Sequence, residues 1–138
     1  MNTGKLFKAF ITIAALVALS LSAYAILNLK TISNNMTVSN ISALEVLDEQ
    51  SNPITSWSWG TFELGEVKMV NFILKNIGNT VLNVNASITD LPLGWSISLS
   101  ETSWTIAPGA SANLTISLRL DEALPVGSYS FSLNFYVP

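Results

Sequence analysis

The sequence predicts an all-β fold, an antiparallel β-sandwich of about seven strands, behind an N-terminal apolar segment. Three observations predict it. From Pro53 onward, apolar side chains occupy every second position in several runs, which is the period of a strand with one buried face. These runs recur about every 10–15 residues and are separated by turn residues, as expected for a two-layer β-domain. The chain also has no Cys, so its core must hold the fold without disulfides.

The expected strands are separated by recognisable turns. Gly78 and Asn79 form one turn, and the segments 107–109 and 124–127 each combine Pro, which fixes φ, with Gly, which allows positive φ. Between the turns, apolar residues alternate with Ser, Thr and Asn, so each run has one apolar and one polar face. The expected strands are 66–76, 80–90, 94–100, 112–120 and 128–137, and the Trp-containing segment 56–59 alternates in the same way.

The chain divides into three segments. We expect residues 1–25 to be a signal peptide or membrane anchor, residues 26–53 a polar lead-in, and residues 54–138 the sandwich. The lead-in is rich in Asn and Ser and alternates loosely around 36–47, where a first strand is expected. We also expect it to be a free segment, and unpaired strand edges invite partner strands.

Two interpretations of the N-terminus stay open. Lys5 and Lys8 precede an uncharged run from Ala9 to Leu29. As a secretory signal, the segment would be cleaved after Ala25, because Ala23 and Ala25 provide small residues at the cleavage site. As an uncleaved anchor, it would form a transmembrane helix, since about 20 apolar residues span a bilayer. In both cases the lysines stay inside, and the rest of the chain is exported to the cell surface or the extracellular space.

The composition argues against several classes of function. Without His or Cys, the usual general base near neutral pH, thiolate nucleophiles and zinc-thiolate sites are missing. We therefore expect no enzyme activity, no cofactor and no metal. Beyond Ala25, four basic minus nine acidic residues give a net charge of −5 with no basic cluster, so nucleic-acid binding is not expected. The acidic pairs 48–49 and 121–122 lack the spacing of a Ca²⁺ loop and are expected to be solvated.

The four tryptophans could fill a core or form a platform for sugars. Trp57 and Trp59 are two residues apart and share a face, while Trp95 and Trp104 are in phase with the apolar positions that follow them. We therefore expect all four rings in the core or at its rim. Trp104 is the candidate for a ligand platform if one ring is exposed.

Four Asn-x-Ser/Thr sequons are candidate N-glycosylation sites, at Asn35, Asn40, Asn85 and Asn113. Asn85 and Asn113 lie on the polar faces of expected strands, where a glycan would be accessible.

Residues 74–133 resemble a known group of domains. The pattern consists of Asn76, Gly78 and Asn79; Leu91, Pro92, Gly94 and Trp95; Pro108 and Gly109; and Pro125, Gly127 and Tyr129. It resembles the immunoglobulin-like accessory domains found beside alpha-galactosidases and in archaeal and bacterial surface proteins, including the cell-adhesion-related (CARDB-like) group. The resemblance implies an immunoglobulin-like sandwich and a role as a spacer, adhesion module or enzyme appendage.

A second, looser resemblance covers residues 54–79. The order Trp-Gly, turn, and strand into Asn-x-Gly-Asn is similar to small archaeal secreted proteins and to TasA/camelysin-type filament subunits. In those filaments, a strand from one subunit completes the sheet of its neighbour.

These expectations favour a structural role. We expect a non-enzymatic cell-surface or extracellular subunit that associates with itself, through strand edges or Ser/Thr/Asn-rich faces, into an oligomer or filament. The alternative is a membrane-anchored binding module for glycans or another envelope protein, and an appendage to a separately encoded enzyme comes third.

Overall fold

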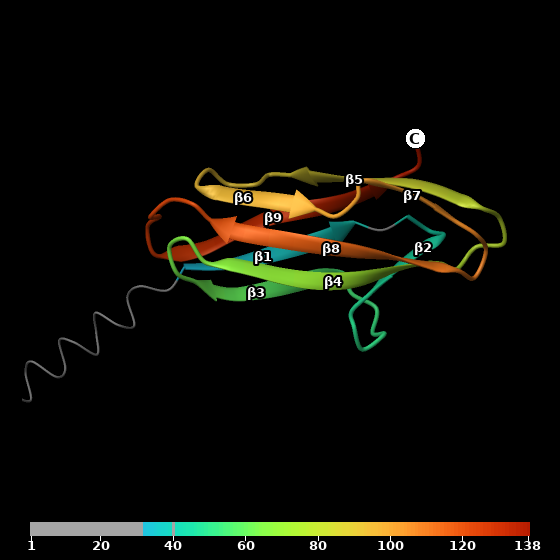
Figure 1. Cartoon of the computed structure of the whole chain (residues 1–138), viewed down its shortest axis with the longest axis horizontal. Coiled ribbons are helices and arrows are strands. Elements are labelled where there is room, and N and C mark those ends of the chain that lie inside the picture. Colours follow the sequence, from blue (N-terminus) through green and yellow to red (C-terminus); the bar gives the residue numbers. More distant parts are fainter. Residues whose placement is uncertain (1–31, 40) are drawn as a thin grey trace, which may run out of the picture. The chain divides into compact units, whose positions relative to one another are not determined.

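The computed structural model describes residues 32–39 and 41–138 of the chain (Figure 1). The expected signal peptide or anchor helix, its cleavage site at Ala23 and Ala25, and the sequon Asn40 lie outside the described residues. Within the described part of the chain, no helix is long and apolar enough to cross a membrane.

The described residues form an all-β domain of two sheets. Sheet A has five strands in the order β3-β1-β9-β5-β7, and sheet B has four in the order β2-β4-β8-β6 (Figure 1). All neighbouring strands are antiparallel except β1 and β9, which are parallel. The strands are β1 (Ile32–Ser39), β2 (Leu44–Leu47), β3 (Ser56–Phe62), β4 (Val67–Asn76), β5 (Leu82–Thr89), β6 (Trp95–Leu99), β7 (Ser103–Ile106), β8 (Ser111–Leu120) and β9 (Gly127–Tyr136).

Consecutive strands never lie in the same sheet. Odd-numbered strands belong to sheet A and even-numbered strands to sheet B, so every connection crosses from one layer to the other. Neighbours within a sheet therefore come from distant parts of the sequence. In Figure 1 the cyan β1 and the red β9, the first and last strands, run side by side.

The core lies between the two sheets and follows the period of two. In β8, Leu114, Ile116, Leu118 and Leu120 are fully buried, while the residues between them are exposed or half-buried. The same alternation in β5 and β9 confirms the expected strands there. Such burial of alternate side chains from two facing sheets is the main source of stability in a domain without disulfides.

The tryptophans occupy the core and its rim, as the sequence predicts. Trp59, Trp95 and Trp104 are buried. The ring of Trp95 packs edge-on against Phe62, with centroids 4.8 Å apart. Trp57 is half-buried and packs edge-on against Phe72 of the opposite sheet at 5.4 Å. Such edge-to-face pairs add about 0.5–1.5 kcal/mol to the burial of the rings.

The domain has more strands than predicted. Nine are present among the described residues, rather than about seven. The stretch 36–47 was expected to hold one strand, but it is interrupted by a turn at Ser42–Ala43 and contributes to both β1 and β2. A further short strand, β7, forms where Trp104 and Ile106 face the core. Short strands at sheet edges carry too few residues for their period to stand out in the sequence.

The lead-in is not a free segment. β1 lies inside sheet A, between β3 and β9, and β2 pairs with β4 in sheet B. The compact β-unit accordingly starts at Ile32, whereas the sequence suggests a sandwich that starts at residue 54. The lead-in is polar in composition, yet Asn34, Met36 and Val38 of β1 are buried.

Candidate functional site

Trp104 does not offer a ligand platform. Its side chain is only 6% exposed, and its ring is tilted against that of Phe135, with centroids 6.3 Å apart. The sequence favoured the core for this ring through its phase with Ile106, and that placement leaves no ring face for a sugar.

The sequons lie on the outer faces of both sheets. Asn35 on β1 is exposed and Asn85 on β5 is half-buried, and both face outward from sheet A. Asn113 on β8 is exposed on the outer face of sheet B. The described structure thus leaves Asn35 and Asn113 accessible and does not bring the sequons together.

In each acidic pair, the aspartate bonds to residues that are close to it in the sequence. The Asp48 carboxylate accepts hydrogen bonds from the backbone N–H groups of Gln50 (2.9 Å) and Asn52 (2.8 Å), and these bonds, that of Asn52 first, hold the pKa of Asp48 below its ordinary value. Asp121 pairs with Arg119 at 3.1 Å. Among the described residues, no three acidic side chains gather in a way that could hold a metal ion.

The Asn-x-Gly-Asn motif has a structural role. The side chain of Asn76 is fully buried, and its Nδ2 donates to the carbonyl oxygens of Thr80 (2.8 Å) and Ile106 (2.9 Å). Its Oδ1 accepts from the N–H of Gly78 at 2.9 Å. Asn76 therefore ties the β4–β5 turn to the end of β7 and stabilises the fold at this point.

The edge of β3 is closed to strand addition. A register shift between Asn34 and Asn35 places a β-bulge in β3. Lys68 reaches across from β4, and its ammonium donates to the carbonyl oxygens of Trp59 (3.1 Å) and Thr61. Bulges and lysines are two devices that keep edge strands from pairing with other chains.

The edge of β4, in contrast, is open over half of its length. β8 pairs with β4 from Val67 to Lys75, but β2 covers the other side only from Ile73 to Asn76. Over Val67–Phe72, no strand of the described chain pairs with that side. We call this stretch the β4 edge.

The pairing of β4 with β8 determines which backbone groups of β4 point to the open side. The N–H of Asn76 donates to Ala110 on the β8 side. Backbone groups of successive residues point to opposite sides of a strand. Val67, Met69 and Asn71 therefore direct their N–H and C=O groups to the open side of β4.

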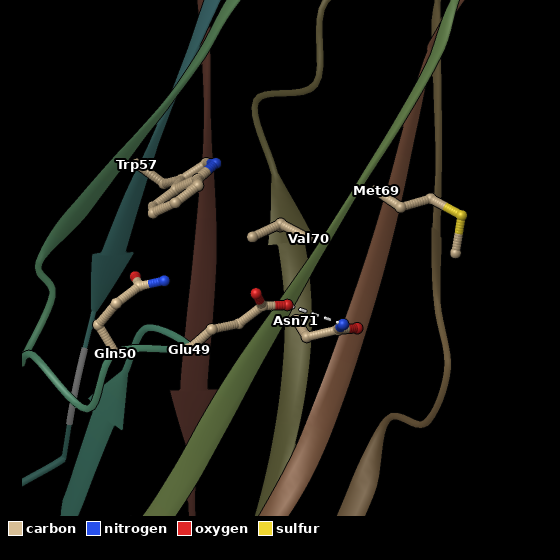
Figure 2. A pocket seen from close by; sticks show the side chains of 6 residues that line it. All are labelled: Glu49, Gln50, Trp57, Met69, Val70 and Asn71. Carbon is tan, nitrogen blue, oxygen red and sulfur yellow. Dashed lines mark hydrogen bonds between the residues drawn. The ribbon is translucent and has the colours of Figure 1, made fainter.

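A shallow pocket adjoins the β4 edge. It measures about 190 Å³ and is lined by Glu49, Gln50, Trp57, Met69, Val70 and Asn71. Figure 2 shows Val70 pointing toward Trp57, and Met69 pointing away from them. Within this lining, the carboxylate of Glu49 accepts a hydrogen bond from Asn71 Nδ2 at 2.9 Å (Figure 2).

Exposed apolar side chains gather along the same stretch. Met69 is 68% exposed, and Leu64 and Val67 are also largely exposed. No site is predicted here from the sequence, although the sequence contains a signal for it. Apolar residues occupy both phases of residues 67–74, with Val70, Phe72 and Leu74 on one face and Val67, Met69 and Ile73 on the other. A strand with one face in the core and one in water requires apolar residues only on the buried face, so apolar residues on its second face are a signal.

No family model matches this chain, and no curated protein matches it either.

Proposed function

We propose that the protein is an exported, non-enzymatic structural subunit of the cell surface or extracellular space, whose copies associate through a strand edge. The observation that carries the proposal is the β4 edge. It combines unpaired backbone groups at Val67, Met69 and Asn71 with exposed apolar side chains beside a half-buried tryptophan.

The energetics of strand addition favour this edge. A strand laid along it would form backbone hydrogen bonds with three residues, each bond contributing about 0.5–1.5 kcal/mol net. Its side chains would also cover Val67 and Met69, and full burial of such an apolar side chain contributes about 1.5–3 kcal/mol. Main-chain pairing supplies affinity in this mode of recognition, and the alternate side chains supply specificity.

The geometry of association decides the assembly. If the β4 edge contacts a different surface of the next copy, the contact repeats head to tail and builds a filament. If two β4 edges pair with each other, the contact closes as a dimer. We favour the filament. Because β1 is paired on both sides within sheet A, a free lead-in strand does not contribute to this assembly.

The immunoglobulin-like class is also part of the proposal. Tyr129, at the start of β9, donates its hydroxyl to the carbonyl oxygen of Pro125 at 2.7 Å. This resembles the tyrosine corner of such sandwiches. The strict alternation of strands between the sheets differs from immunoglobulin constant domains, in which some consecutive strands share a sheet.

A membrane-anchored binding module for glycans or another envelope protein is the second candidate. The observation that favours it is the pocket at Trp57, where an indole ring adjoins a carboxylate and two amides (Figure 2). Retention on a glycan affinity gel that is lost in Trp57→Ala, with self-association unchanged, would favour this function over the first.

The test of the first proposal closes the β4 edge with a charge. Met69→Lys adds an ammonium beside the open backbone groups, and Asn113→Lys adds the same charge to the exposed outer face of β8. The chain is taken as processed by an exporting host and studied by light scattering and electron microscopy. We expect filaments or other large assemblies for the wild type and Asn113→Lys, and none for Met69→Lys. Wild-type protein that stays monomeric at high concentration, or Met69→Lys that assembles normally, would refute the proposal.

A further inference from the structure

The described strands of sheet A contribute no charged side chain to its outer face. No strand of sheet A contains a charged residue, whereas those of sheet B contain Glu45, Lys68, Lys75 and Arg119. Within the strands, the outward positions of sheet A are Ser, Thr or Asn, with Tyr136 at one end as the exception.

The small polar side chains of this face lie in rows across the strands. Ser58, Asn35 and Ser130 are neighbours in register across β3, β1 and β9. Several side chains bond to each other between strands, including Thr105 to Asn83 at 2.8 Å and Asn134 to Thr89 at 2.9 Å. Short side chains lose little rotamer freedom when they are covered, so ordering them costs little.

The rest of the domain is strongly acidic. Residues 32–138 contain three basic and nine acidic side chains, and three minus nine gives a net charge of −6. Copies that approach through most surfaces therefore repel each other. The outer face of sheet A is a broad surface where two copies can meet without bringing charged strand residues together, and interface centres are generally depleted of charged residues.

The area of the face matches a weak interface. With strands about 4.8 Å apart and about 3.3 Å per residue, the five strands cover about 600 Å². Two such faces bury about 1,200 Å², the lower end of the range for specific complexes. On contact, the hydroxyl and amide groups of the two faces replace hydrogen bonds to water by hydrogen bonds to each other. Each such bond contributes little net free energy.

We propose that the outer face of sheet A is a second self-association surface, which takes the same face of another copy. The inference goes beyond the proposed edge association, because it concerns the opposite sheet and a different kind of contact. A single pair is weak, with a dissociation constant on the order of 1 mM, and many pairs along an assembly add up through avidity. Such a contact would join assemblies side by side.

The dependence of self-association on ionic strength distinguishes this contact from one held by ion pairs. Added salt screens the repulsion between the net charges of two copies and leaves an uncharged interface intact. Self-association through this face therefore strengthens with ionic strength, whereas an interface held by ion pairs weakens.

The experiment isolates the face by closing the β4 edge first. All variants carry Met69→Lys and are measured by sedimentation equilibrium up to high concentration, as the chain is processed by an exporting host, in detergent if the apolar N-terminus is retained. We expect residual self-association in this background. Adding Ser130→Lys, at the centre of the face, is expected to weaken it at least about tenfold, because like charges then meet in the contact. Adding Asn113→Lys on sheet B leaves it unchanged.

Two further variants keep the outcome unambiguous. Ser130→Thr preserves the uncharged face and is expected to retain the association, and Asn35→Lys repeats the charge test at a neighbouring exposed position if Ser130→Lys does not fold. The proposal is overturned if the Met69→Lys background shows no self-association, or if Ser130→Lys and Asn113→Lys behave alike. It is also overturned if mass spectrometry finds a glycan on Asn35 or Asn85, since either glycan would cover the face.

Discussion

Replacing Asn76 by Ala is expected to destabilise the domain strongly, because the side chain of Asn76 makes hydrogen bonds inside the fold. Its side chain makes three hydrogen bonds that join the end of β4, the β4–β5 turn and the end of β7. Alanine keeps the strand but removes two donors and one acceptor from a fully buried position.

The magnitude follows from what each partner loses. The carbonyl of Ile106 bonds to Asn76 in a buried environment, and an unsatisfied buried acceptor costs about 1–3 kcal/mol. The partners at Thr80 and Gly78 are only part-buried, so water can replace the lost bond at about 1 kcal/mol each. The sum is about 3–5 kcal/mol, a large share of the 5–15 kcal/mol that typically stabilises a domain.

The assay is denaturant unfolding followed by the fluorescence of the buried tryptophans. Asn79→Ala is the matched control, because Asn79 belongs to the same motif but is exposed, and its effect should stay within about 0.5 kcal/mol. Asn76→Asp keeps the shape and the acceptor for Gly78 but loses both donors, so it should destabilise the domain as well. The reasoning is refuted if Asn76→Ala loses less than about 1 kcal/mol or if Asn79→Ala loses as much.

Two further predictions test the turns and the closed edge. Gly94 has a φ of +85°, and an added Cβ would lie 2.8 Å from Leu124 Cδ2, so Gly94→Ala should cost about 2–3 kcal/mol in the free energy of unfolding. Gly109→Ala is strained only in its backbone, because nothing lies within 4 Å of its Cβ, and should cost about 1 kcal/mol; equal losses would contradict the steric argument. Lys68→Met frees the carbonyl oxygens of Trp59 and Thr61 and should increase self-association as measured by light scattering. Lys75→Met removes the same charge from the outer face of β4, so an equal increase there would show that charge rather than the β3 edge is responsible.

Much of the fold could be predicted because one physical rule governs it. Alternation of apolar and polar residues assigned a buried and a wet face to β5, β8 and β9, and it placed the tryptophans in the core or at its rim. The rule works there because each long strand has one face against the opposite sheet and one against water.

The same rule does not identify the neighbours of a strand. β1 is paired on both sides in the middle of sheet A, although the sequence suggested a free segment, because a period of two is the same for central and edge strands. The β4 edge escaped prediction for the same reason. It arises because β2 stops pairing at Ile73, and only the extra apolar residues at Val67 and Met69 hinted at it.

Hydrogen exchange at single amides of β4 tests the β4 edge most directly. In the monomer, the N–H groups of Val67, Met69 and Asn71 face the open side and should exchange quickly, while those of Lys68, Val70 and Phe72 are held by β8 and should exchange slowly. If copies associate through this edge, assembly slows exchange at Val67, Met69 and Asn71 and leaves the other three as they were. Assemblies in which these three amides still exchange as fast as in the monomer would contradict the account.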